Sequence, residues 1–131
     1  MATLNATLRL EATAGQLGDS ALSLEVTDAL TVGQNFRALS RATVTTVGAN
    51  NIIQPATDGQ TYYLYVKHTG TSDGSAATTE TLNVELTGDV IFGKLAAGEF
   101  CFIPIGSHSL GVQLQSSSGN IVAEYAYFVR G

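Results

Sequence analysis

The sequence predicts an all-β protein, folded as a single-domain β-sandwich or jelly roll of roughly eight to ten strands. Apolar residues recur at every second position in many short segments, and no long segment repeats with the helical period. Turn-forming residues separate these segments at short, regular intervals. Because successive side chains of a strand point to opposite faces, a period of two indicates strands that bury one face.

The N-terminal third begins with the clearest alternation. Residues 3–12 alternate leucine or alanine with polar residues, and residues 21–27 do the same after a glycine-containing loop. Residues 28–37 fit either period. Gly33 and its β-branched neighbours favour extended chain followed by a loop there.

The middle of the chain continues in the same way. Residues 36–45 alternate again, and the apolar pair Ile52-Ile53 interrupts the polar connection that follows. Residues 62–68 combine β-branched and aromatic residues, which is typical of a strand. The longest polar loop covers residues 69–80, and its turn signal is Asp73-Gly74.

Five more strands are expected in the last third. Residues 81–87 and 110–115 alternate strictly, and residues 90–95 are short and apolar. Residues 100–105 follow a turn that contains glycine, and residues 121–129 are apolar on both faces. We see no repeat and no linker, so residues 1–131 are expected to form one domain.

The composition narrows the classes of partner. Charged residues make up 13% of the 131 residues, about half the ~25% that is usual for a globular domain. Such a surface suits a chain that packs against neighbouring proteins. The net charge of −5, without a basic cluster, indicates no nucleic-acid partner. No signal peptide, membrane segment or intrachain disulfide is predicted.

The histidines do not predict a catalytic or metal site. His108 lies between Ser107 and Ser109, but neighbours in a turn cannot meet as nucleophile and base, so a solvated turn is the better interpretation. His68 ends a strand and is expected to be exposed. Two distant histidines without further ligands at metal spacing predict no zinc site.

The remaining reactive side chains also favour structural roles, so we predict no catalytic, cofactor-binding or metal-binding residues and no enzyme activity. Cys101 stands among aromatic and aliphatic residues, which favours buried packing over a reactive thiolate. A solvated strand face is favoured over a glycosidase pair for the main carboxylates. They are Glu11, Glu25, Glu80, Glu85 and Glu124.

Tyrosines are the strongest candidates for a functional surface. They crowd two strands, at Tyr62, Tyr63, Tyr65, Tyr125 and Tyr127. Alternation places Tyr62 on one face of the first strand and Tyr63 and Tyr65 on the other. Two interpretations stay open. The rings belong to the core on both sides, or one face meets another subunit, where tyrosine is enriched. We take the five as candidate protein-interface residues.

Three segments resemble small bacteriophage virion proteins. Residues 62–70, YYLYVKHTG, resemble a YIYIKNTG-like strand of that group. Residues 95–105, LAAGEFCFIPI, resemble its L-x-P-G-E-x-x-F-x-P strand pair, with Ala97 in place of the usual proline. Residues 122–128, VAEYAYF, are similar to its final strand.

This resemblance implies a non-enzymatic β-sandwich protein of the virion, made in the bacterial host cytoplasm and needing no cofactor. Capsid cement or decoration is the leading function. Its implied partners are major capsid or tail subunits and further copies of the chain in a homo-oligomer. The alternative is a tail or fibre-tip module that binds a host receptor or a carbohydrate. Residues 15–20 and 71–80, which are almost bare of aromatic residues, disfavour that alternative.

Overall fold

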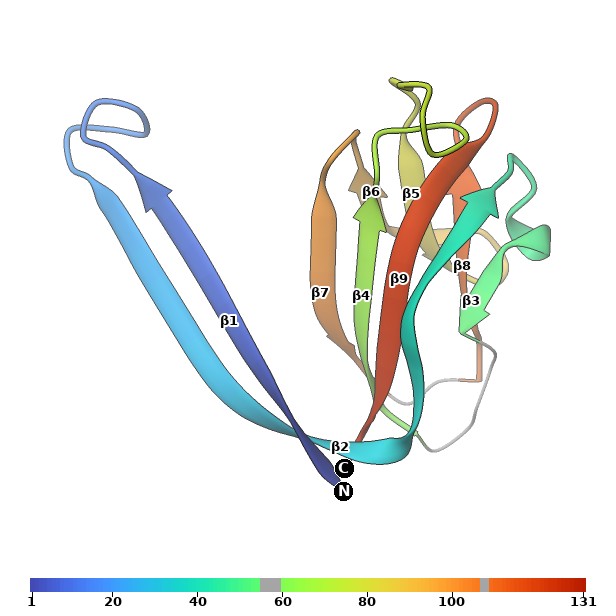
Figure 1. Ribbon diagram of the computed structural model, residues 1–131, viewed down its shortest axis with the longest axis horizontal. Coiled ribbons are helices and arrows are strands. Elements are labelled where there is room, and N and C mark those ends of the chain that lie inside the picture. Colours follow the sequence, from blue (N-terminus) through green and yellow to red (C-terminus); the bar gives the residue numbers. More distant parts are fainter. Residues whose placement is uncertain (55–59, 107–108) are drawn as a thin grey trace. The chain divides into compact units, whose positions relative to one another are not determined.

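The computed structural model describes residues 1–54, 60–106 and 109–131, and within them the side chains other than those of residues 34–38 and 54. This part of the chain is all-β and contains no α-helix, as predicted (Figure 1). A 3₁₀ turn, η1, covers Gly48–Asn50. The strands are β1 (Ala2–Ala12), β2 (Leu22–Val44), β3 (Ile52–Gln54), β4 (Tyr62–His68), β5 (Leu82–Leu86), β6 (Val90–Leu95), β7 (Phe100–Ile105), β8 (Val112–Ser116) and β9 (Ile121–Arg130).

The chain divides into two compact units. Residues 1–34 with Gly131 form an antiparallel hairpin, in which β1 pairs with the first half of β2 from Ala2↔Val32 to Ala12↔Leu22. Residues 35–130 form the β-sandwich. Since β2 belongs to both units, the assignment of residues 1–131 to one domain stays a prediction.

Two antiparallel sheets have the strand orders β1-β2-β9-β4-β7 and β3-β8-β5-β6. From β2 onward the neighbours are nested in sequence: β2 lies beside β9, β3 beside β8, β4 beside β7 and β5 beside β6. A long antiparallel ribbon that is rolled up on itself gives this nesting, which is the winding of a jelly roll. The fold prediction is therefore confirmed.

The core of the sandwich lies between its two sheets. Leu64 and Val66 of β4 face Val84 of β5 and Leu114 of β8, and all four side chains are buried. Successive side chains of a strand point to opposite faces, so the residues that alternate with these core residues point outward from each sheet. Tyr63, Tyr65 and the other odd-numbered residues of β4 thus face away from the core.

The expected loop within residues 28–37 is wrong. β2 continues without a break from Leu22 to Val44. The pairing with β1 holds Leu30 and Val32 in one strand, and a glycine inside a strand weakens it without ending it. The pair Ile52-Ile53, expected to lie in a connection, begins the short strand β3.

The part of the chain that the structure describes has no helical segment with the length and hydropathy of a membrane span.

Candidate interface surfaces

The five candidate tyrosines lie on two different sides of one sheet. The register pairs Tyr62 with Val129, Leu64 with Tyr127 and Val66 with Tyr125. Since opposite residues share a face, Tyr62, Tyr125 and Tyr127 point inward with the core. Tyr63 and Tyr65 point outward. Whether any of the five meets another subunit stays a prediction.

The inward tyrosines pack within the sandwich. Tyr62 is buried, and its ring meets Tyr127 edge-on at 5.8 Å between centroids. Its hydroxyl donates a hydrogen bond to Oε1 of Gln60 at 2.7 Å. Tyr125 and Tyr127 pack against the buried core residues. These contacts give the three rings a packing role within the sandwich.

The outward side chains of β9, β4 and β7, three neighbouring strands in Figure 1, form a surface that we call the aromatic face. By register it comprises Tyr63, Tyr65, Lys67, Phe100, Phe102, Pro104, Glu124, Ala126 and Phe128. Phe100 is 62% exposed and Phe102 is 42% exposed. Tyr63 stacks on Phe102 with centroids 6.0 Å apart, and the Arg130 guanidinium lies 5.7 Å from the Tyr63 ring centroid.

On the aromatic face, Glu124 has charged and polar partners, but Lys67 has no ion pair among the described residues. The Tyr65 hydroxyl donates to Oε1 of Glu124 at 3.1 Å, and Arg41 Nε lies 3.5 Å from Oε2 of the same carboxylate. Burial, followed by the hydrogen bond and charge of Glu124, raises the pKa of Tyr65 above its ordinary value. Lys67 stands opposite Phe100 and Glu124, and it forms no ion pair within the described residues.

The hairpin presents a second apolar surface, which we call the hairpin face. Its register places the even-numbered residues of both strands on one side: Leu4, Ala6, Leu8, Leu10, Ala12, Leu22, Leu24, Val26, Asp28 and Leu30. Leu8 is 47% exposed and Val26 is 54% exposed. The alternation correctly predicts these strands, but the burial that it implies is absent. The opposite side is polar, with Thr7 bonded to Thr27 and Arg9 paired with Glu11.

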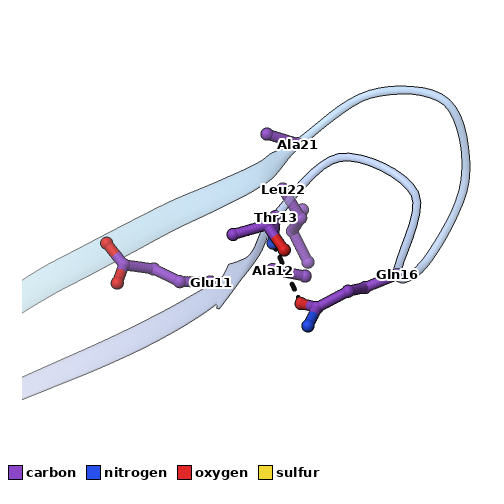
Figure 2. Close-up of a pocket in the computed structure, with 6 residues that line it drawn as sticks. All are labelled: Glu11, Ala12, Thr13, Gln16, Ala21 and Leu22. Atoms are coloured by element: carbon purple, nitrogen blue, oxygen red, sulfur yellow. Dashed lines mark hydrogen bonds between the residues drawn. The ribbon is translucent and has the colours of Figure 1, made fainter.

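A shallow depression of about 330 Å³ lies at the tip of the hairpin (Figure 2). The backbone N–H of Thr13 donates to Oε1 of Gln16 there at 3.1 Å, which ties the turn to itself. Glu11 is the one charged residue among its lining side chains, and the figure shows its carboxylate pointing away from the others. This turn therefore lacks the converging polar groups of a small-molecule site.

The expected exposure of His68 is wrong, because its side chain is fully buried. The ring pins the loop 69–80: Nδ1 accepts the N–H of Gly70 at 2.9 Å, and Nε2 lies 2.8 Å from the carbonyl of Glu80. These partners assign the proton to Nε2. The sequence did indicate this burial, since His68 is spaced by two residues from Val66 and by four from Leu64 and so shares their face of the strand.

The expected solvation of Glu85 is also wrong, since this residue is 0% exposed. Gln113 Nε2 donates to Oε1 of Glu85 at 2.6 Å and to Oδ1 of Asp89 at 3.2 Å. Oε2 of Glu85 has no hydrogen-bond partner in the described structure. Alternation places Glu85 on the outward side of β5, but Gly48 of η1 covers the pair. The result is a buried polar cluster outside the main core.

Gly48→Ala should lower the free energy of unfolding by about 1–3 kcal/mol, because it disrupts a buried hydrogen bond to a charged group. A Cβ at Gly48 would lie 2.5 Å from Nε2 of Gln113 and 2.6 Å from Oε1 of Glu85. Urea unfolding measures the change. Gly106→Ala is the control, since a Cβ there meets nothing within 4 Å. Equal effects of the two substitutions would contradict this account.

Cys101 is half-buried on the inward side of β7, not fully buried as expected. Burial raises the pKa of its thiol, and a hydrogen bond with the Val66 backbone opposes part of that shift. Less thiolate is therefore present at a given pH than in the unfolded chain. We expect a disulfide reagent at pH 8 to label the native thiol at least about tenfold more slowly than the urea-unfolded one. Equal rates would show that the thiol is freely accessible.

His108 and Ser107 lie outside the described residues, so the prediction of a solvated turn stays untested. Among the residues that the structure does describe, no three histidine, cysteine or acidic side chains gather as metal ligands. Comparison with protein-family models finds no match to this chain, and comparison with curated proteins finds none either.

Proposed function

We propose that the protein is a non-enzymatic structural subunit of a bacteriophage particle, acting as capsid cement or decoration. One observation carries the proposal: exposed apolar side chains gather on the hairpin face and, along β7, on the aromatic face. Contiguous apolar surfaces of this kind on a soluble protein are typical of protein–protein contact sites. The low charged fraction of 13% agrees with extensive burial against neighbouring subunits.

The virion-like segments support the same function by their position. Residues 62–70, 95–105 and 122–128 contain most of β4, β7 and β9, which are neighbours in one sheet. The resemblance is therefore concentrated on the strands that bear the aromatic face. A jelly roll is shared by viral capsid, lectin and cupin domains, so the fold agrees with this function without selecting it.

The mechanism is attachment by many repeated contacts. Within the sandwich, the paired strands hold the aromatic face in a fixed form, so little conformational entropy is lost when it binds. Many copies on one particle turn modest single contacts into strong attachment. Particle stability would then increase with occupancy of the sites.

The test uses purified particles of the phage whose genome encodes the chain. We expect quantitative mass spectrometry to find many copies of the chain per particle, and gold-labelled antibody to mark the capsid surface. Absence of the chain from washed particles would reject a virion role. Label confined to the tail tip would reject capsid cement and favour receptor or carbohydrate binding.

A further inference from the structure

The hairpin face and the aromatic face have similar areas in flat projection. Two strands of 11 residues, at about 3.3 Å per residue and 4.8 Å between strands, give the hairpin face about 350 Å². A length of 6 residues across three strands gives the aromatic face about 290 Å² by the same geometry. The two outlines, about 36 Å by 10 Å and about 20 Å by 14 Å, can overlap over at most about 190 Å².

A second copy of the chain is the occupant that covers both faces at once. In any closed arrangement of identical copies, each chain gives one hairpin and receives one. Each copy then covers at most about 380 Å² of its own surface over its two faces together. Two hairpin faces packed on each other would leave the aromatic face of both copies uncovered.

Each face carries one charge that forms no ion pair among the described residues, and the two charges have opposite signs. Asp28 is the one charged residue on the hairpin face, where it stands opposite Ala6. Lys67 lies on the aromatic face between Phe100 and Glu124, and the Glu124 carboxylate is paired with Arg41. Neither forms an ion pair within the part of the chain that the structure describes. Packing one hairpin face on another would bury Asp28 without a cation, at a substantial desolvation cost.

We propose that the hairpin face of one copy packs on the aromatic face of a second copy, with Asp28 beside Lys67 of that copy. An isolated two-stranded hairpin is marginally stable in water, so this contact also supplies the cover that β1 and β2 need. An anionic membrane is a poor occupant, because Asp28 and the net charge of −5 would be repelled by its surface. The inference rests on the proposed structural role and names the partner surface.

The first test measures self-association of the purified chain by analytical ultracentrifugation. We expect a mass above that of the monomer that falls on dilution. Leu8→Asp, on the hairpin face, should raise the dissociation constant at least about thirtyfold, the effect of losing a central interface side chain. Asn5→Asp, on the polar side of the same strand, is the matched control and should change it less than about threefold. Equal effects, or a monomer at all concentrations, would overturn the proposal.

A charge exchange tests the pairing itself. Asp28→Lys and Lys67→Asp should each raise the dissociation constant at least about tenfold, and the double variant should restore it. A mixture of the two single variants should also associate, because a lysine hairpin then meets an aspartate face. Failure of both the double variant and the mixture to associate would overturn the contact. Since these assays contain no particle, their failure is distinguishable from absence of the chain in virions.

Discussion

Gln113→Leu is expected to lower the free energy of unfolding by about 3 kcal/mol. Within the described residues, the side chain of Gln113 is the one hydrogen-bond partner of the Glu85 carboxylate, and Glu85 is fully buried. Leucine fills the space but donates nothing, so the substitution leaves a buried carboxylate without a partner. Such groups cost several kcal/mol because they have lost water and gained no compensating bond. Urea unfolding at pH 7 measures the loss.

Two further variants separate this explanation from a packing defect. Gln115→Leu, on the same strand, removes an exposed hydrogen bond to the Thr46 carbonyl and should cost at most about 1 kcal/mol. The double variant Glu85→Leu/Gln113→Leu removes both polar partners and should recover most of the lost stability. If the double variant is less stable than Gln113→Leu, an unpaired carboxylate is not the cause.

The second large effect distinguishes the inward tyrosine of β4, Tyr62, from the outward Tyr65. Tyr62→Ala is expected to cost about 3–5 kcal/mol of folding free energy, as for other buried aromatic truncations. Its ring is buried against Tyr127, and its hydroxyl is bonded to Gln60. Thermal unfolding at matched protein concentration is the measurement.

Tyr65→Ala, on the aromatic face, should instead act on assembly. We expect the dissociation constant for self-association to rise about thirtyfold, which corresponds to about 2 kcal/mol. Thr78→Ala in the loop 69–80 is the control and should leave assembly unchanged. If Tyr65→Ala unfolds the chain while the folded fraction associates normally, the ring of Tyr65 serves the core.

The alternation predicted the strands well, because it depends on which side chains share a face of one strand. It could not predict what covers that face, since the cover comes from distant parts of the chain. Leu8 and Leu114 stand in equally regular patterns, yet Leu114 lies in the sandwich core and Leu8 is about half exposed, at 47%. The sequence therefore did not show that the apolar side of the hairpin is exposed.

The buried polar residues also show that alternation does not predict what covers a strand face. The outward position of Glu85 followed from its parity in β5, but the turn at Gly48 that covers it is 37 positions away in the numbering. For the tyrosines, parity separated Tyr62 from Tyr63 and Tyr65. It did not say which side is the core, because both sides of β4 are apolar.

The position of β9 governs how the sandwich can assemble during synthesis. β9 lies between β2 and β4 in its sheet, although it is the last of the strands along the chain. Until residues 121–130 leave the ribosome, β2 and β4 have no strand between them, and their inward apolar side chains remain uncovered. The hairpin pairs residues that are close in sequence and can form early. Closing the sheet therefore waits until residues 121–130 have been synthesised, and chaperones that hold exposed strands would act on the chain in that interval.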